Sequence, residues 1–374
     1  MFRIDFGFSG LCFFPMAKRT SLFFMGGGVG AHLYSLVASE MLGKENVHVL
    51  MRDRTDEVPV RTLCVWGEPA SLIHDAVVAQ WATLRFGFGD ETIVRRMDRM
   101  RYSQYTAASI RALVDATIDV ERQIGEVNNP DASSTVSFDS RHDDRDVRPA
   151  SISLLQHFHG WRVLTDEPMF EPDVATMMDF RVDQSDGVCF VYVLPYGPTE
   201  ALVECTVFSE STWQKDHYEA RLTSYLRDVM GINDYRISTT ETGSIAMCDR
   251  IPLRQRGRSW IAIGVAGGLT KPTTGYTVAR CLRDAEKIMQ HYQRTGEFKP
   301  PARAHARFDW YDRLLLRIIR DEPAEVPGIL WTLFKRNPIE RILRFLDEQT
   351  DLKEEILIFW RLPWLPFLRA IVRR

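Results

Sequence analysis

The chain has 374 residues, of which 45% are hydrophobic, so it is long enough for two domains and able to build packed cores. Its 47 lysines and arginines nearly balance 50 aspartates and glutamates, which excludes a general nucleic-acid binder and a highly charged, mostly disordered chain. The six cysteines have no paired spacing, which argues against a disulfide framework or a cysteine-based zinc site and favours a reducing compartment.

An uncharged stretch, residues 20–39, opens the interpretable part of the chain. It is long enough for a membrane-spanning helix, but its glycines are typical of a tight turn. We therefore predict a buried strand over residues 21–25, a glycine turn, a helix over 31–42 and a second short strand over 47–51. Residues 1–20 are expected to be an N-terminal extension, to which the sequence assigns no function.

A strand, a glycine turn, a helix and a second strand form the opening unit of a dinucleotide-binding fold. The turn fits Gly-x-Gly-x-x-Gly/Ala, with Gly26, Gly28, Gly30 and Ala31 as the small residues. These residues allow a tight turn, close approach of backbone to pyrophosphate, and close helix packing, while the helix N-terminus supplies free N–H groups. Asp53 is the expected ligand of a ribose hydroxyl, displaced by about one residue from the usual place. A glycine turn without a ligand is the alternative.

The middle of the chain changes character twice. Residues 74–127 are predicted to be largely helical, with the charged run 95–99 on a solvated face, and residues 136–141 are predicted to be a third strand. From 151 to 247, short apolar runs separated by turn residues predict a largely antiparallel sheet inserted into the nucleotide-binding fold. Residues 260–264 have the character of a buried parallel strand, and a glycine-rich loop then leads to a helix from about residue 276.

The tail from Phe308 has a helical, strongly apolar pattern and ends in a basic stretch. None of its apolar runs is long enough to span a bilayer. Tryptophan and arginine beside aliphatic residues suit a helix that lies in a membrane interface, and a helix packed on the protein body is the equal alternative.

Several segments, in a fixed order, resemble the lycopene cyclase family of flavoproteins. They are similar to the family's QHFxGW, FDP, LMDFR, YVLP, FLEET, ExGxIPM and IGxAGGxxKPSTGY motifs. Here they are QHFHGW (156–161), FEP (170–172), MMDFR (177–181), YVLP (192–195), LVECT (202–206), ETGSIAM (241–247) and IGVAGGLTKPTTGY (263–276). Ala246 stands where the family has proline, and the ordered matches run from about residue 26 to 344.

The resemblance implies an α/β fold with a Rossmann-like FAD-binding domain formed by residues 21–150 and 251–300. Residues 151–250 would be the inserted, largely antiparallel β-sheet substrate domain. Residues 301–374 would be a helical region that faces a membrane on its cytoplasmic side, as a peripheral contact.

The family closes rings at the ends of lycopene, an acyclic carotenoid. An acid protonates the terminal double bond, the next double bond attacks the cation, and a base removes a proton to leave a β-ionone ring. The resemblance therefore implies a lycopene β-cyclase that uses reduced FAD, with NAD(P)H as reductant and without net redox change. The alternative is a redox flavoenzyme of the same superfamily, such as a hydroxylase or polyprenyl reductase. The nine histidines show no metal-ligand spacing, so we expect no metal.

The expected FAD contacts in the second glycine-rich loop are Gly264, Gly267, Gly268, Pro272, Thr274 and Gly275. These residues follow a predicted buried strand and lead into a helix. The N-terminus of that helix is expected to face the edge of the flavin where negative charge accumulates.

Carboxylates in the matched segments supply the expected acid and base. Glu204, in an alternating apolar strand, is the central candidate, because burial raises the pKa of a carboxyl toward a proton-donating form. A glutamate on the wet face of the strand is the alternative. Asp179 and Glu241 are the secondary carboxylates. The expected substrate-binding residues are His157, Trp161 and Arg181, although each histidine or tryptophan suits a core role equally well and Arg181 could instead neutralise Asp179.

Overall fold

The computed structural model describes residues 19–68, 72–141, 150–302 and 306–372. The predicted N-terminal extension lies outside these residues, apart from its last two, and the first strand begins at Thr20.

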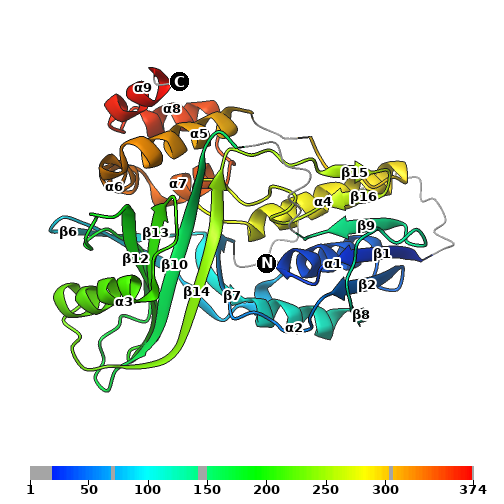
Figure 1. Cartoon of the computed structure of the whole chain (residues 1–374), viewed down its shortest axis with the longest axis horizontal. Coiled ribbons are helices and arrows are strands. Elements are labelled where there is room, and N and C mark those ends of the chain that lie inside the picture. The colour runs from blue at the N-terminus through cyan, green and yellow to red at the C-terminus, as the bar shows by residue number, and fades with distance from the viewer. Residues whose placement is uncertain (1–18, 69–71, 142–149, 303–305, 373–374) are drawn as a thin grey trace.

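A six-stranded sheet forms the first part of the molecule (Figure 1). Its order is β15-β16-β9-β1-β2-β8, and all neighbours are parallel except β15 with β16. The strands are β1 (Thr20–Met25), β2 (Val47–Asp53), β8 (Val120–Ile124), β9 (Val136–Asp139), β15 (Gln255–Gly257) and β16 (Trp260–Ala262). The helices α1 (Val29–Leu42), α2 (Ala107–Thr117) and α4 (Val278–Thr295) pack on one face through a continuous apolar core. This is the predicted Rossmann-like layer.

A seven-stranded, largely antiparallel sheet forms the second part, in the order β14-β10-β13-β12-β11-β5-β6. Its strands are β5 (Thr83–Phe88), β6 (Glu91–Arg96), β10 (Ser153–Leu164), β11 (Val174–Asp179), β12 (Val188–Gly197), β13 (Glu200–Ser209) and β14 (Arg236–Cys248). Helix α3 (Lys215–Ser224) covers its outer face, and a three-stranded sheet lies over part of the other face. That small sheet contains β3 (Thr62–Gly67), β7 (Arg101–Thr106) and β4 (Ala79–Trp81).

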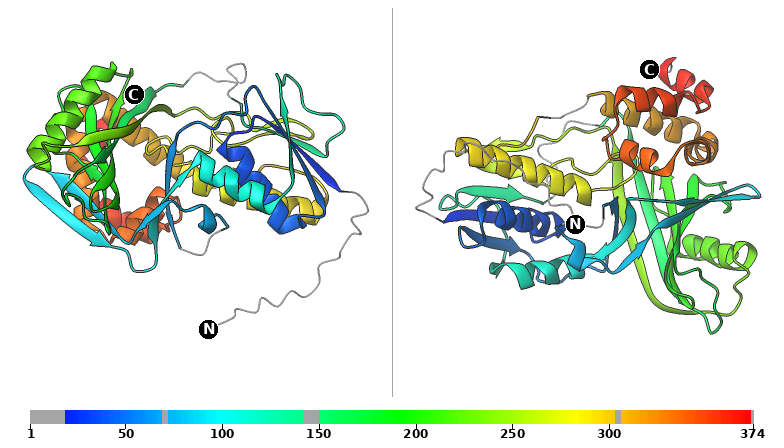
Figure 2. Two further views of the ribbon diagram at one scale, coloured as in Figure 1. Left: turned by 90° about the horizontal axis from the view of Figure 1, so that it is seen from below. Right: turned by 180° about the vertical axis from the view of Figure 1, so that it is seen from behind.

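The C-terminal helices pack on the same inner face of the large sheet, opposite α3 (Figure 2). They are α5 (Ala306–Asp321), α6 (Val326–Arg336), α7 (Ile339–Leu346), α8 (Leu352–Phe359) and α9 (Trp364–Val372). Phe334 of α6 stacks on Phe86 of β5 with ring centroids 4.1 Å apart. Across the described ranges, no helix is both long and apolar enough to cross a membrane.

The predicted fold class is confirmed, but the prediction of a largely helical segment over residues 74–127 is wrong. Only α2 and a short 3-10 turn (His74–Ala76) are helical there, and the remainder supplies strands β4 to β8. Leu84 and Phe86 alternate toward the core of the large sheet, so the period is two rather than 3.6. Because β5 and β6 join this sheet, it draws residues from before the expected boundary at 151.

Candidate active site

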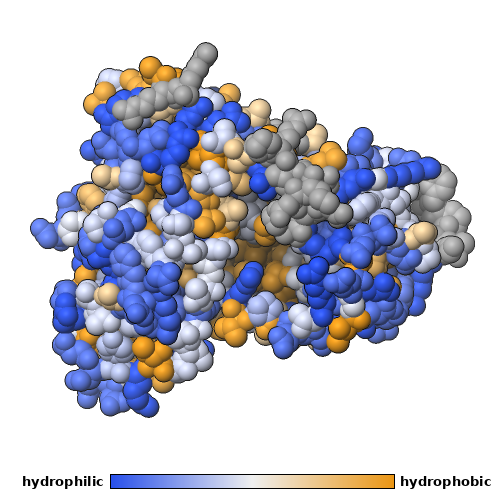
Figure 3. Space-filling view, viewed as in Figure 1, coloured by the Kyte–Doolittle hydropathy of each residue, from blue (hydrophilic) through white to orange (hydrophobic). Residues whose placement is uncertain are grey.

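A cavity of about 420 Å³ extends from the glycine turn after β1 to the inner face of the large sheet. Its volume lies within the range of small-molecule and cofactor sites. Figure 3 shows the hydrophobic hollow that separates the two parts of the molecule. One end of the cavity is lined by backbone and polar groups, and the other by the side chains of β10, β12, β13 and β14.

The first glycine turn shapes the polar end. Gly26 has φ of 100°, and a Cβ there would lie 2.5 Å from the Ser140 hydroxyl, so its role is in the turn and it does not line the cavity. Gly30 lies against Gly264, because a Cβ on Gly30 would be 3.5 Å from the Gly264 Cα. Ala31 is fully buried and packs helix α1 on the sheet. The small residues therefore have different roles: Gly26 allows the turn, Ala31 packs the helix on the sheet, and Gly30 forms part of the cavity wall.

Asp53 is the last residue of β2, which is two residues longer than predicted. The carboxylate therefore stands at the strand end, where a ribose ligand is expected. Its Oδ2 accepts a hydrogen bond of 2.7 Å from the Gly27 N–H, and the residue lines the cavity. The structure thus brings Asp53 to the glycine turn.

The second glycine-rich loop forms the opposite wall. Gly264, Thr274 and Gly275 line the cavity, and both glycines have positive φ. Gly267 and Gly268 lie outside the lining, because their neighbours are the Ala262 carbonyl and the Pro252 ring. The other predicted loop contact outside the lining is Pro272. Buried Lys271 anchors the loop to α5, with its Nζ 2.8 Å from both carboxylate oxygens of Asp312.

Three features of the polar end, two at the first glycine turn and one in the second loop, show that it fits a dinucleotide such as FAD. The backbone of Gly28 is extended, and apart from its chain neighbours no atom of the described residues lies within 4 Å of a Cβ built on it, so the surrounding protein does not require glycine there. Helix α1 begins at this turn without a side-chain cap or an acidic residue in its first turn, which leaves N–H groups for an anion. The buried hydroxyl of Thr274 has no hydrogen-bond partner in the described structure.

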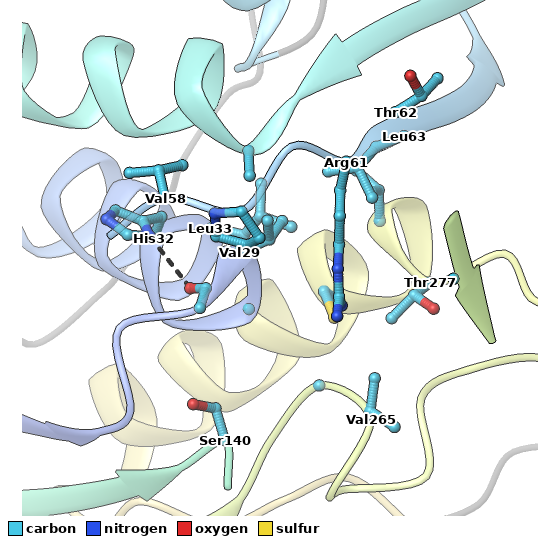
Figure 4. A pocket seen from close by; sticks show the side chains of 18 of the residues that line it. Val29, His32, Leu33, Val58, Arg61, Thr62, Leu63, Ser140, Val265 and Thr277 are labelled. Carbon is cyan, nitrogen blue, oxygen red and sulfur yellow. Dashed lines mark hydrogen bonds between the residues drawn. The ribbon is translucent and has the colours of Figure 1, made fainter. Parts of the chain in front are cut away.

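Two side chains at this end were not predicted from the sequence. Arg61 extends from the segment before β3 into the cavity, between α1 and the start of α4 (Figure 4). His32 contacts the turn through its Nδ1, 3.0 Å from the Gly28 carbonyl oxygen. Burial lowers the pKa of His32, so the imidazole is neutral at physiological pH. Neither residue belongs to a recognised motif, and only the fold brings them here.

Glu204 lies at the apolar end of the same cavity. Alternate residues of β13 pack against α3, while Leu202 and Glu204 point to the other face and line the cavity. The Thr206 hydroxyl donates a 3.0 Å hydrogen bond to Glu204 Oε1. Burial, and then the neighbouring Glu241 carboxylate, raise the pKa of Glu204 well above its ordinary value. Glu204 is therefore a carboxylic acid that keeps its proton beside apolar walls, which are formed by Phe158, Tyr192, Leu194 and Ile245 among others.

Glu241 lies close to Glu204 but does not line the cavity. It is held by Thr62, a residue of the cavity lining, whose N–H and hydroxyl both donate to Glu241 Oε2, at 3.2 and 2.9 Å. The structure therefore brings the two predicted glutamates together, with only Glu204 facing the space that a substrate could enter.

His157 and Trp161, the expected substrate-binding residues, do not line the cavity. Both are odd-numbered residues of β10 and point to the α3 face, away from the cavity. His157 contacts the Ser209 hydroxyl at 2.7 Å and the Tyr218 ring, and burial lowers its pKa to about 4. Trp161 donates to His159 Nε2 at 3.1 Å. Both residues are buried, and their polar atoms have hydrogen-bond partners within the protein.

The expectation of a catalytic role for Asp179 and a substrate role for Arg181 is also not supported by their places. Asp179 is fully buried at the end of β11, accepts from the Arg181 guanidinium at 2.7 Å and from the Tyr225 hydroxyl at 2.8 Å, and does not line the cavity. A Cβ at Gly87 would overlap its carboxylate, so the pair is enclosed. This is a structural ion pair, as the alternative interpretation of the sequence anticipated. Among described residues, no group of three or more His, Cys, Asp or Glu side chains is arranged to hold a metal ion.

Known proteins show which family this chain resembles. The family model described as lycopene cyclase protein matches residues 22–372. Lycopene beta-cyclase from Paracoccus sp. (strain N81106 / MBIC 01143) is 27% identical over 258 residues, which are 61% of this chain and 62% of that protein. Lycopene beta-cyclase from Pantoea ananas is 25% identical over 220 residues, 56% of each chain. The alignments thus span less than two thirds of either relative.

Solved structures share the fold at low identity. A flavoprotein/dehydrogenase from Cytophaga hutchinsonii superposes with a TM-score of 0.61 and 12% identity, covering 95% of this chain and 98% of that one. A geranylgeranyl bacteriochlorophyll reductase-like protein from Thermoplasma acidophilum gives 0.58 and 13%, covering 95% and 96%. The structural likeness establishes the fold, while the family match extends over nearly all of the sequence. The chain belongs to the lycopene cyclase family.

Proposed function

We propose that this protein is a lycopene β-cyclase that closes the ends of lycopene by acid–base catalysis. The observation that carries the proposal is the place of Glu204, a protonated carboxyl on the apolar wall of a cavity that also contains the glycine turn. Family membership supports the choice of an acyclic carotenoid as the substrate.

In this reaction a single residue, Glu204, both donates the proton and takes one back. Glu204 donates its proton to the terminal double bond, which forms a C–H bond and a tertiary cation. The next double bond then forms the ring C–C bond, and the cation loses a proton from a neighbouring carbon back to the Glu204 carboxylate. The product is an isomer of the substrate, and the acid is regenerated. Apolar walls at Leu194, Leu202 and Phe158 exclude the water that would trap the cation.

Reduced FAD, with NAD(P)H as reductant, is the cofactor that we propose. Gly28, Gly30 and the α1 N-terminus would hold its pyrophosphate, Asp53 its ribose, and Thr274 would donate or accept a hydrogen bond. When bound, the reduced cofactor supplies an electron-rich ring system, which favours a nearby positive charge.

The test is expression in lycopene-accumulating cells, followed by chromatography of the pigments. We expect cyclic products isomeric with lycopene from the wild type and none from Glu204→Gln. Glu200→Gln, on the same strand but outside the cavity lining, is the matched control and should remain active. Stoichiometric consumption of NAD(P)H per product by the purified protein would instead assign the redox alternative, a hydroxylase or polyprenyl reductase.

We further propose that α8 and α9 contact a membrane surface from the cytoplasmic side, as a peripheral attachment. Trp360 is 88% exposed, and Ile356, Trp364 and Leu365 are each at least 58% exposed. Arg361 is exposed beside them. Tryptophan, aliphatic residues and arginine on one short segment suit the interface between acyl chains and headgroups.

Vesicle co-sedimentation tests this attachment. We expect the protein to pellet with vesicles that contain acidic phospholipids, and we expect Trp360→Ser/Trp364→Ser to lower the partition coefficient by about tenfold or more. Trp310→Ser removes a 47% exposed tryptophan from α5, outside this segment, and is the matched control. Equal binding by all three proteins would refute the proposed contact.

A further inference from the structure

A glycine separates the two glutamates of the cavity. Strand β10 lies between β13 and β14, and Gly160 of β10 pairs directly with Glu204 on one side and with Glu241 on the other. Residues that are directly paired across neighbouring strands point to the same face of the sheet. The Glu204 and Glu241 backbones are therefore two strand spacings apart, roughly 10 Å, with position 160 between them.

The space above Gly160 is what allows the two side chains to meet. A Cβ built on Gly160 would lie 3.3 Å from Glu204 Cβ, 3.3 Å from Glu241 Cγ and 3.0 Å from Leu202 Cδ1. Both glutamates thus lean over a residue that has no side chain. Gly160 has no positive φ, so its backbone does not require glycine; the need comes from these neighbours.

Hydrogen bonds fix the orientation of the Glu241 carboxyl relative to Glu204. Thr62 occupies Glu241 Oε2 with two donors, while Glu241 Oε1 is buried and finds no donor elsewhere in the described structure. The Glu204 carboxyl lies close enough for Glu241 to raise its pKa, and two carboxyls side by side can be joined by one shared proton. Since Oε2 already accepts two bonds, Oε1 is the Glu241 oxygen left to accept a proton from Glu204.

We propose that Glu241, fixed by Thr62 across the open position of Gly160, is a positioning residue that orients the protonated carboxyl of Glu204 and stays out of contact with substrate. The inference rests on the proposed function for its role in catalysis. In this proposal Glu204 transfers the proton to and from the substrate. Glu241, which the sequence predicted to be a second catalytic carboxylate, instead orients the Glu204 carboxyl.

The thiol and the phenols near the pair do not ionise in the working pH range. Burial raises the pKa of Cys64 on β3 and of Tyr196 on β12 to about 12. Burial likewise raises the pKa values of three further phenols, on β7, β12 and the second loop: Tyr102, Tyr192 and Tyr276. Arg162 lies over the Tyr196 ring, pairs with Glu200 and stays charged. A carboxyl band from this region therefore reports Glu204.

Infrared difference titration of the purified protein tests the pair without relying on activity. The wild type should show a protonated carboxyl band that persists above the pH range in which an ordinary glutamate ionises, and this band should be absent in Glu204→Gln. Glu241→Gln removes the neighbouring carboxyl and supplies an amide N–H that can donate to ionised Glu204, so the band should titrate at a lower pH than in the wild type. Persistence of the band at the wild-type pH in Glu241→Gln would overturn the inference, whether or not the protein cyclises lycopene.

Initial rates then test the catalytic consequence. Thr62→Val removes one donor and should lower the rate about ten- to a hundredfold, whereas Thr62→Ser keeps the hydroxyl and should restore most of it. Gly160→Ala should lose activity and shift the carboxyl band, while Gly197→Ala, a strand glycine with no atom within 4 Å of its Cβ position, should do neither. An inactive Glu204→Gln beside fully active Thr62→Val and Gly160→Ala would leave the proposed function standing and refute the positioning role.

Discussion

Replacing Glu204 with glutamine should abolish cyclisation and at the same time change how the stability of the fold depends on pH. In the folded protein, burial and then the Glu241 carboxylate raise the pKa of Glu204 well above the ordinary value of 4.5. In the unfolded chain the carboxyl ionises near that ordinary value. Between the two pKa values the folded state binds one more proton at Glu204 than the unfolded state, so the contribution of Glu204 to stability is greatest at low pH and falls as pH rises.

The magnitude follows from the linkage relation. Each pH unit inside that window costs the wild type about 1.4 kcal/mol of unfolding free energy, and the loss ends once pH exceeds the folded-state pKa. Glutamine does not ionise, so the variant avoids this cost. The unfolding free energy of Glu204→Gln relative to wild type should therefore increase as pH rises above the unfolded-state pKa of the carboxyl, and it should level off above the folded-state pKa.

Urea unfolding of both proteins at a series of pH values measures this difference. The samples are matched in flavin content, because a bound ligand adds to apparent stability. Any constant offset from a lost hydrogen bond leaves the slope unchanged, so the slope is the readout. Parallel curves for wild type and Glu204→Gln would refute the argument that folded Glu204 holds a proton, and Glu200→Gln controls for the loss of a carboxylate elsewhere on β13.

Two further predictions separate ligand contacts from structural roles. Gly28→Val should leave the apo-protein's melting temperature nearly unchanged, because among the described residues only chain neighbours come within 4 Å of the Cβ position. The same variant should lower flavin occupancy, measured by absorbance, at least tenfold, and a normal flavin content would place the cofactor elsewhere. Asp179→Asn should destabilise the fold by about 2–4 kcal/mol, seen in thermal melts, because Arg181 loses a buried partner, while the folded fraction keeps its activity. An inactive Asp179→Asn with wild-type melting would restore a catalytic role for this residue.

Local patterns predicted the nucleotide-binding half well, because its signals are short-range. The strand, glycine turn and helix at residues 20–42 follow from one apolar run interrupted by glycines. Alternation along β13 placed Glu204 on one face with Leu202, opposite Val203 and Cys205. The family motifs then identified which glutamate to consider first.

Pattern reasoning failed where the deciding contact is distant in the chain. Residues 83–96 form a hairpin whose strand β5 also pairs with β11, about 90 residues later in the chain. The hydrophobic pattern of the segment itself does not predict this distant pairing. His157 and Trp161 alternate correctly with Phe158, but the sequence does not say which face α3 covers. The sequence therefore predicted the alternation of these side chains correctly, but it did not predict which of the two faces lines the cavity.

By itself, the sequence determined that this protein has a dinucleotide-type turn, a largely antiparallel second sheet and a glutamate in an apolar strand. Those features depend on residues that are neighbours in the chain, where hydrophobic period and glycine content act directly. Only the tertiary structure decided that Gly160 lets Glu241 meet Glu204 and that Thr62 fixes the pair. These residues are separated by 37 to 179 positions, and their proximity is set by strand order and register rather than by any local preference.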